Sequence, residues 1–421
     1  MRERLRNFYE NNSLVIKNFT SLSFIKIFAL LSPFLYYPIL IRKLGAEDYG
    51  YILQSHVAVF FIVILVEFGF NISATKEVAK ARENIPILSN VTFSVYIAKA
   101  LLFSIAAAVY SLIIVMLDLD ELNTQIYLIA LLIPFGFIFY SEWFLQGIEE
   151  MALLAAINSL SQLILLILVF FFIPDSYDLR IVALFLTLPY LLNGAITFCY
   201  SLYKTSLKSF IFTAKSIWET LVMSLPFFLS KLSAVGFFRV VAVLVGSVLG
   251  PIALALFDLA DKLVSLLLLP LQMLNQAIYP SIARSKDVGK IKTLILFLLP
   301  ISICIYVGSL FFIETFIEFY AGSDMVVAYE LYKFLALLLP ISAVSYFIGN
   351  TVLVVKGFDR EFSFSTIFST ILCFIILWIN NVFSEFSLRS ACYLIVIHGL
   401  LVCATQLYFC KTKNVFSKDV I

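Results

Sequence analysis

The chain has 421 residues, of which 62% are hydrophobic and 13% charged, and its mean hydropathy is +1.02. These values exclude an ordinary soluble domain, in which roughly half of the residues are apolar and about a quarter are charged. The formal net charge of +2 gives no indication of a nucleic-acid partner.

Apolar runs long enough to cross a hydrocarbon core of about 30 Å recur along the whole chain, and their hydrophobic period is helical. The basic N-terminal segment lacks the compact apolar core and the cleavage site of a signal peptide, so we expect it to lead directly into the first helix. In chain order we predict twelve membrane-spanning helices, at residues 15–41, 49–75, 87–117, 125–147, 152–173, 181–203, 217–248, 253–281, 293–313, 329–355, 362–383 and 390–409. The sequence therefore predicts an all-α integral membrane protein.

Lysine and arginine are distributed unevenly between the two sets of connecting segments. Each segment on the predicted side of the N-terminus carries two or more basic residues, whereas the connectors on the other side hold Arg42, Lys43, Arg180 and Arg389. Basic residues resist translocation across the membrane. We therefore predict that both termini are cytoplasmic and that the basic residues record the membrane topology.

Cysteine and histidine give no sign of redox or metal chemistry. The six cysteines form no Cys-x-x-Cys pair, and no histidine cluster accompanies them. This pattern predicts neither a disulfide framework nor a metal site, and we expect no cofactor. His56 and His398 each stand alone on an apolar segment, where packing in the core is the expected role.

Two segments in the two halves of the chain share a pattern. Lys26 precedes Gly45, and Lys231 precedes Gly250, by the same number of residues, and each glycine follows a leucine. Many transporters are built from two related halves, and an even number of helices in each half makes the repeats parallel. We predict an N-terminal lobe of six helices at 1–203, a basic cytoplasmic linker at 204–216 and a C-terminal lobe of six helices at 217–421.

Several charged residues fall inside the predicted membrane-spanning helices. A lysine or arginine at the bilayer centre costs about 2.5–3.5 kcal/mol, so such residues normally face the interior of a bundle or an aqueous cavity. Near the ends of their helices, Glu219, Glu330 and Lys333 are expected to reach the membrane interface. The other charged residues are the cations Lys26, Lys99, Lys231, Arg239 and Lys262 and the acids Glu67, Glu142, Asp258 and Asp261.

Two interpretations remain open for the charged residues of the seventh and eighth predicted helices. Asp258 and Lys262 are four residues apart on one helical face, and Arg239 lies at a similar predicted depth. With Asp261 they form either a structural cluster of ion pairs or part of a substrate site. A structural pair is also credible for Lys26 with Glu67.

Lys99 and Lys231 lead to different expectations. Lys99 is at a depth that suits pairing with Glu142. Lys231 has no acid nearby on its own helix beyond Glu219, and none on the inner half of the next helix. An uncompensated lysine at mid-membrane suggests an anionic ligand such as a phosphate.

Four short motifs resemble one transporter family. They are "RKLGAEDYGYI" after the first helix, "GFNISATKEVAK" at the end of the second, "LQGIEEM" after the fourth and "LADKLVSLLLLPLQMLNQAIYPSIAR" through the eighth. They resemble the polysaccharide-transporter branch of the multidrug/oligosaccharidyl-lipid/polysaccharide flippase superfamily, whose typical members are the bacterial O-antigen repeat-unit flippases. The resemblance extends over essentially the full chain.

The resemblance implies a V-shaped pair of six-helix lobes around a central cationic cavity in a multi-pass protein of the bacterial inner membrane. It implies alternating access that moves an undecaprenyl-pyrophosphate-linked oligosaccharide from the cytoplasmic to the periplasmic leaflet, amid membrane lipid. A polysaccharide polymerase and a chain-length regulator would be its protein partners. By the same resemblance, the cavity would be lined by Lys26, Lys231, Arg239, Asp258, Asp261 and Lys262. We predict that Lys26, Lys231, Arg239 and Lys262 bind substrate and that Asp258, Asp261, Glu67 and Lys99 act in gating or ion pairing. Lys26 stands where related flippases often have arginine.

Two alternative functions are considered. An ion-coupled exporter of drugs or other cations, from the same superfamily, would present unpaired carboxylates to its substrate, whereas the sequence indicates an unpaired lysine. A membrane polysaccharide polymerase would need catalytic groups in a sizeable outer loop, and the longest outer connector, "ETFIEFYAGSDMVVA", has no basic residue to hold a phosphate leaving group. We therefore expect a transporter, not an enzyme.

Overall fold

The computed structural model describes the backbone of residues 2–173, 177–206, 213–285, 289–383, 386–413 and 415. Side chains are described from residue 31 onward, except at 230, 233–234, 276–277, 279–281, 283–285, 289–290, 350 and 380–383. Within these ranges all regular structure is helical. The side chain of Lys26 and residues 207–212 of the predicted linker lie outside the described part.

The chain divides into two compact units, and each unit is made of two separate stretches of the sequence. Unit 1 consists of residues 1–43 and 55–231, and unit 2 consists of residues 44–54 and 232–421. Each unit therefore includes a segment that is flanked in sequence by the other unit. The predicted lobes 1–203 and 217–421 stay a prediction.

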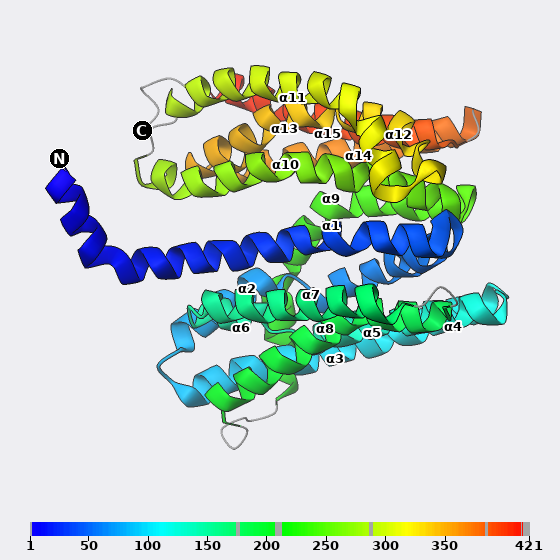
Figure 1. The fold of residues 1–421 in the computed structure, drawn as a ribbon. Coiled ribbons are helices and arrows are strands. Elements are labelled where there is room, and N and C mark those ends of the chain that lie inside the picture. Colours follow the sequence, from blue (N-terminus) through cyan, green and yellow to red (C-terminus); the bar gives the residue numbers. More distant parts are fainter. Residues whose placement is uncertain are drawn as a thin grey trace. The chain divides into compact units, whose positions relative to one another are not determined.

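The first two predicted membrane helices form one long element, α1 (Arg2–Glu67), with a sharp kink. At the kink Gly45 has φ 76° and ψ 173°, a backbone conformation that is essentially restricted to glycine. Figure 1 shows the long first arm of α1, in dark blue, turning back at its far end. This reversal is what two successive membrane-spanning helices require.

Replacing Gly45 by alanine is expected to destabilise the protein by about 1–3 kcal/mol, because an alanine at this φ and ψ is strained. The effect comes from the backbone alone, since a Cβ atom at this position has no other atom within 4 Å. Thermal unfolding of the purified variant measures the change. The matched control is Gly308→Ala, which adds a methyl group in open space at a helical position and should be neutral or slightly stabilising. Equal melting temperatures for both variants would contradict the strain.

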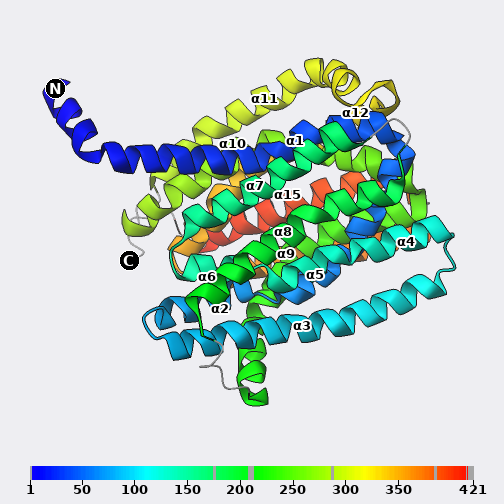
Figure 2. The same ribbon diagram turned by 60° about the horizontal axis from the view of Figure 1, so that its bottom comes forward.

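The rest of unit 1 begins with α2 (Phe70–Ala81), which a short break at Phe68 and Gly69, both with positive φ, separates from α1. Asn84 then caps α3 (Ile85–Met116), since its side chain accepts a hydrogen bond from the backbone N–H of Ile87. Next come α4 (Glu121–Ala130), α5 (Leu132–Phe139), α6 (Glu142–Gly147), α7 (Met151–Phe172) and α8 (Leu179–Lys204). Both α5 and α7 pack against α8, as Figure 2 shows.

The fourth predicted membrane helix is interrupted. The helical segments α4, α5 and α6 together cover it, and Tyr140 and Ser141 between α5 and α6 are not helical. An interruption of this kind leaves backbone carbonyls without their usual helical partners. These carbonyls must find other donors inside the membrane, where unsatisfied backbone groups are costly.

Helix α9 (Ala214–Leu249) belongs to both units, because residues 214–231 pack in unit 1 and the remainder in unit 2. Unit 2 continues with α10 (Pro251–Ser285), α11 (Gly289–Ala321), the 3-10 turn η2 (Ser323–Met325), α12 (Ala328–Leu335), α13 (Leu338–Tyr346), the π-helix η3 (Phe347–Leu353), α14 (Asp359–Phe383) and α15 (Leu388–Thr412). Helices α10 and α15 both pack against α12 and α13, and α14 packs against α15.

The segment 44–54 packs closely within unit 2. Gly50 approaches the first residue of α10 so closely that a Cβ atom would collide with the Pro251 carbonyl. Four residues further, the Gln54 side-chain amide donates a hydrogen bond of 2.5 Å to the Gly246 carbonyl oxygen on α9. Glycine is therefore required at position 50 by packing.

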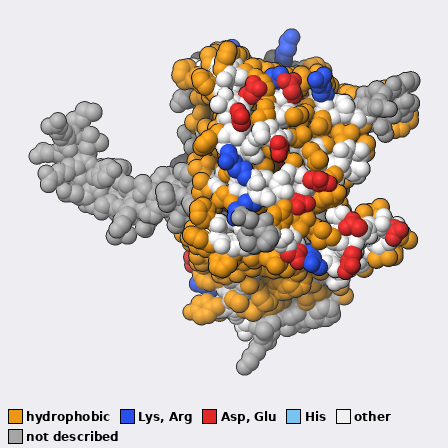
Figure 3. Space-filling model, turned by 45° about the vertical axis from the view of Figure 1, so that its right-hand side comes forward, with side chains coloured by type: hydrophobic (Ala, Val, Ile, Leu, Met, Phe, Trp, Pro, Cys, Tyr) orange, Lys and Arg blue, Asp and Glu red, His pale blue; other side chains and the backbone are white. Residues whose placement is uncertain are grey.

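Hydrophobic side chains, in orange, cover much of the face that Figure 3 shows. Among the described residues, nine helical segments are long and apolar enough to cross a membrane, and Val235–Leu249 is a shorter apolar one. The prediction of an all-α integral membrane protein is confirmed. The count of twelve spanning helices stays a prediction, although each predicted range falls largely on helical backbone.

Candidate functional site

Glu67 and Lys231 form an ion pair within unit 1. Lys231 Nζ contacts Glu67 Oε2, and the Asn71 side-chain amide donates a hydrogen bond of 3.2 Å to Glu67 Oε1. The Glu67 side chain is 9% exposed, whereas the Lys231 side chain is 33% exposed. The carboxylate side chain is therefore largely buried, and about a third of the lysine side chain stays accessible.

The expectation that Lys231 lacks an acidic partner was wrong. Its partner is at the end of α1, far away in sequence, so inspection of neighbouring helices could not find it. Two contacts explain why this part of α9 lies there: Phe228 stacks on Phe68 with a ring distance of 4.6 Å, and Ser224 shares a hydrogen bond of 2.6 Å with Ser73 on α2. The proposed pair of Glu67 with Lys26 falls outside the described side chains.

Lys99 on α3 is almost completely buried, with 1% exposure. Its Nζ donates hydrogen bonds to the carbonyl oxygens of Phe137 at 3.1 Å and Tyr140 at 2.9 Å. These carbonyls lie at the interruption between α5 and α6. Lys99 therefore satisfies backbone groups that the broken helix leaves free, a role that the sequence did not indicate.

Hydroxyl groups bond further backbone groups at this interruption. The Ser141 backbone N–H donates to Thr197 Oγ1 at 3.0 Å, and the Ser141 hydroxyl donates to the Phe139 carbonyl at 2.8 Å. The Tyr96 hydroxyl shares hydrogen bonds with Ser141 and with Ser201. The interruption is thus a polar element built from tertiary hydrogen bonds, and the sequence analysis, which predicted one continuous helix here, missed it.

Glu142, in the first turn of α6, is a fourth charged residue that interacts with Glu67, Lys99 and Lys231. It accepts a hydrogen bond of 2.7 Å from Gln146 and interacts electrostatically with Lys99 and Lys231. Glu67, Lys99, Glu142 and Lys231 together are named the unit 1 charge cluster. Its two cations and two acids balance one another, which is how charges are tolerated at membrane depth.

A second group of charges lies in unit 2. Asp258 Oδ2 accepts hydrogen bonds from the Tyr49 hydroxyl at 3.0 Å and from Lys262 Nζ. Lys262 Nζ is also 3.1 Å from the Tyr49 hydroxyl oxygen, so the three groups form a triangle. Arg239 on α9 interacts electrostatically with Asp261 and Lys262 on α10.

Arg239, Asp258, Asp261, Lys262 and Tyr49 are named the unit 2 charge cluster. The i, i+4 pair of Asp258 and Lys262 that the sequence indicated is present. Tyr49 was missed as a member, although it lies in the "RKLGAEDYG" motif. Among the described residues, no group of three or more histidine, cysteine or acidic side chains could hold a metal ion.

A family model decides what this chain is related to. The model described as "Polysaccharide biosynthesis protein" matches residues 15–286, which include both charge clusters. The chain belongs to the polysaccharide biosynthesis protein family. The predicted resemblance is therefore confirmed by a match to well over half of the chain.

Two curated members of this polysaccharide biosynthesis family carry the same name, "Putative O-antigen transporter". The protein from Escherichia coli (strain K12) is 26% identical over 269 residues, which cover 63% of this chain and 64% of that protein. The protein from Shigella dysenteriae is 24% identical over 340 residues, with coverages of 79% and 84%. The match to the E. coli protein thus spans slightly less than two thirds of its length.

Solved structures with the same fold are membrane transporters. The lipid II flippase MurJ in an inward closed conformation has a TM-score of 0.74 at 15% identity, with 94% of this chain and 89% of that chain covered. An inward-facing multidrug resistance transporter of the MATE family has a TM-score of 0.72 at 18% identity, with coverages of 93% and 96%. At these identities the likeness establishes the fold that this polysaccharide biosynthesis protein shares with them.

Proposed function

We propose that the protein is a flippase that moves an undecaprenyl-pyrophosphate-linked oligosaccharide, an O-antigen repeat unit, from the cytoplasmic to the periplasmic leaflet of the bacterial inner membrane. The family match and the names of its relatives support this assignment. The observation that carries the chemistry is the Lys231 side chain, one third exposed although its acidic partner is buried. An ammonium group in this position can contact a second anion.

The proposed substrate contacts are those of a pyrophosphate with a set of cations. Lys231 binds the pyrophosphate with help from Lys26, and Arg239 and Lys262 are the other proposed substrate contacts. The oligosaccharide stays in an aqueous space between the lobes, and the prenyl tail stays in the lipid. A lysine acts here as a point charge, whereas arginine would make bidentate contacts.

The acids of the two clusters serve as resident counter-ions in this mechanism. A pyrophosphate competes with Glu67 for Lys231, and with Asp258 and Asp261 for Arg239 and Lys262. Because substrate and carboxylate bind the same ammonium group, the ion pairs form an element with two states whose balance the substrate can shift. Alternation between these states accompanies alternating access.

Transport without chemical conversion, both termini in the cytoplasm, and cooperation with a polysaccharide polymerase and a chain-length regulator are part of the same proposal. A drug or cation exporter is the second candidate, since the fold is also that of a MATE transporter. That candidate would use Glu67 or Glu142 as its cation site. In the unit 1 charge cluster two lysines balance the two acids, which counts against a binding site for a cationic substrate there.

The proposal is tested by complementation of a bacterial strain that lacks its own repeat-unit flippase. Expression of this chain is expected to restore surface polysaccharide when the strain synthesises the matching repeat unit, and candidate repeat units are supplied in turn. Immunoblotting of membranes controls for expression. Resistance to cationic dyes without restored polysaccharide, for every repeat unit tried, would instead support the exporter.

A further inference from the structure

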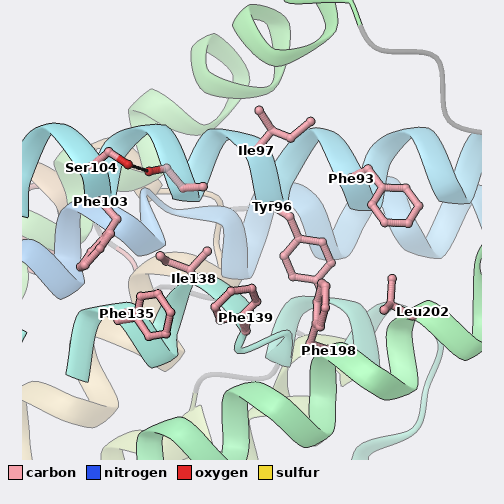
Figure 4. A pocket seen from close by; sticks show the side chains of 11 residues that line it. Phe93, Tyr96, Ile97, Phe103, Ser104, Phe135, Ile138, Phe139, Phe198 and Leu202 are labelled. Carbon is pink, nitrogen blue, oxygen red and sulfur yellow. Dashed lines mark hydrogen bonds between the residues drawn. The ribbon is translucent and has the colours of Figure 1, made fainter. Parts of the chain in front are cut away.

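Unit 1 contains an apolar cavity that no part of the proposed pyrophosphate site uses. It has a volume of about 550 Å³ and lies between α3, α5 and α8 (Figure 4). Five phenylalanines and Tyr96 provide most of its wall. Figure 4 shows Tyr96 extending from α3 toward Phe139 on α5 and Phe198 on α8.

The cavity offers no free polar group to a ligand. Two lining residues carry hydroxyl groups, and both hydroxyls are already bonded within the protein. The Tyr96 hydroxyl contacts Ser141 and Ser201, and the Ser104 hydroxyl donates a hydrogen bond of 2.8 Å to the Ala100 carbonyl, drawn as a dashed line in Figure 4. Sugar and phosphate groups would lose their hydrogen bonds there, so the chemistry fits a hydrocarbon.

The cavity is open along one side. Tyr96, Phe93 and Ile138 are buried at its floor, whereas Ser104 and Phe135 are exposed at its rim. The exposed face of α3 continues from the rim with large aliphatic side chains, at Leu101, Ile105, Val109 and Leu112. This surface is apolar enough to face lipid, so the cavity is a groove that a chain in the membrane can enter laterally.

Contact with hydrocarbon alone does not select an occupant, because a lipid tail gains no hydrophobic energy by moving from the bilayer into an apolar groove. Selection must come from shape and from dispersion contacts. Here the wall is a series of edge-to-face ring pairs, in which Phe135 contacts Phe103 at 5.8 Å and Phe139 at 5.4 Å, and Phe139 contacts Phe198 at 5.1 Å. The regularly spaced methyl branches of an isoprenoid add dispersion contacts with this wall of rings, and a straight acyl chain has no such branches.

Basic residues gather beyond one end of the groove. Phe93 and Leu202 form this end, where the Ser206 backbone N–H donates to Ser89 Oγ at 2.9 Å and joins the end of α8 to the start of α3. Lys204 is nearby, as the last residue of α8. Lys215 is nearby too, because the hydroxyl of the next residue, Ser216, shares a hydrogen bond of 2.8 Å with Ser94 on α3. By the charge pattern this is the cytoplasmic end.

Both lysines form long ion pairs with their acidic partners. Lys204 is 4.0 Å from Glu150, and Lys215 is 3.8 Å from Glu219. Exposed pairs contribute little to stability, so a phosphate can replace the carboxylate at either lysine. An apolar groove with lysines at one end matches the two parts of a lipid with an anionic head.

We propose that the groove between α3, α5 and α8 binds the polyprenyl tail of the lipid-linked substrate before transport. This inference rests on the proposed function and adds a tail site to it. A volume of about 550 Å³ holds roughly 18 non-hydrogen atoms, if each takes about the volume of a liquid water molecule, which corresponds to three or four isoprene units. The groove thus holds the head-proximal part of the tail before transport, and the remainder of the tail stays in the lipid.

Photolabelling of the full chain in lipid nanodiscs tests the tail site. The probe is undecaprenyl phosphate with a diazirine in its first isoprene units, and phosphatidylglycerol with a diazirine in its acyl chain serves as the comparison. The undecaprenyl probe is expected to label the wild-type chain at residues 93–104, 135–139 and 198–202. Excess unlabelled undecaprenyl phosphate should suppress this labelling, and excess phosphatidylglycerol should not.

Two variants fill the groove. Ala100→Trp places an indole inside it, and Ser104→Trp places one at its exposed rim, where no repacking is needed. Each is expected to lower labelling roughly tenfold, the factor that corresponds to about 1.4 kcal/mol of binding. Ala108→Trp, on the exposed part of the same helix and outside the groove, should label like the wild type.

Equal labelling by the phosphatidylglycerol probe, without competition by undecaprenyl phosphate, would overturn the inference and leave an ordinary lipid-facing groove. Labelling of the wild-type chain requires no variant, so a folding defect cannot decide the result.

The outcomes of the labelling and complementation experiments distinguish failure of the tail site from failure of the proposed function. If complementation restores polysaccharide while labelling lies elsewhere, the tail site alone is wrong, and if complementation fails with every repeat unit, the proposed function is wrong.

Discussion

Lys231→Ala is expected to abolish surface polysaccharide in the complementation assay. The substitution removes the proposed pyrophosphate contact and also leaves the Glu67 carboxylate buried without its ammonium partner. The second effect can cost about 3 kcal/mol of stability, since breaking a buried pair strands a charge. Both the amount of protein in the membrane and the polysaccharide at the surface are therefore measured.

The double variant Lys231→Met, Glu67→Gln separates the two effects. It removes both charges and keeps similar side-chain volumes, so that Asn71 still has a carbonyl oxygen to bond at position 67. We expect it to regain the melting temperature that Lys231→Ala loses and to remain inactive in transport. Recovery of transport together with stability would mean that Lys231 is a structural ion-pair partner only.

Lys99→Met is expected to be the most destabilising single substitution in unit 1. It leaves the carbonyls of Phe137 and Tyr140 without donors and removes a cation from the unit 1 charge cluster. Losses of this kind cost about 3–5 kcal/mol, which lowers the melting temperature of a domain of this size by roughly 10 °C. Thermal unfolding in detergent measures the change.

The control is Lys333→Met, which removes a lysine that is paired with Glu330 at 2.5 Å on an exposed surface. Its melting temperature should stay close to that of the wild type, because exposed ion pairs contribute little to stability. A Lys99→Met protein as stable as the wild type but without transport would contradict the structural role and support the gating role expected from the sequence. The structural role is supported if Lys99→Met loses stability and its transport falls in proportion to the amount of protein in the membrane.

The sequence was sufficient to predict the fold because membrane helices are encoded locally. A span needs only about 20 apolar residues, so α3, α7 and α8 fall within a few residues of the predicted ranges. The reversal at Gly45 was also visible, as a Leu-Gly pair in a short polar connector. The interruption at Tyr140 and Ser141 was not visible, because its cause is a set of tertiary hydrogen bonds to Lys99 and Thr197.

The candidate site was only partly predictable for the same reason. Pairing between Asp258 and Lys262 follows from helical spacing and was found. Pairing between Lys231 and Glu67, and the position of Tyr49 beside Asp258, depend on segments that meet only in the folded chain. Composition and spacing identify the charged residues that are costly to bury in a membrane. Only the tertiary structure identifies the residue that pairs with each of them.

The division of the chain into units has a consequence for biosynthesis. Residues 44–54 pack in unit 2, and Gln54 is separated by 192 residues from its hydrogen-bond partner Gly246. At about 5–20 residues per second, the ribosome needs roughly 10–40 s to produce that partner. During this interval the turn after Gly45 is already made, but the residues that it packs against do not yet exist. Maturation of the first helical hairpin therefore cannot be completed until translation of the second half is under way.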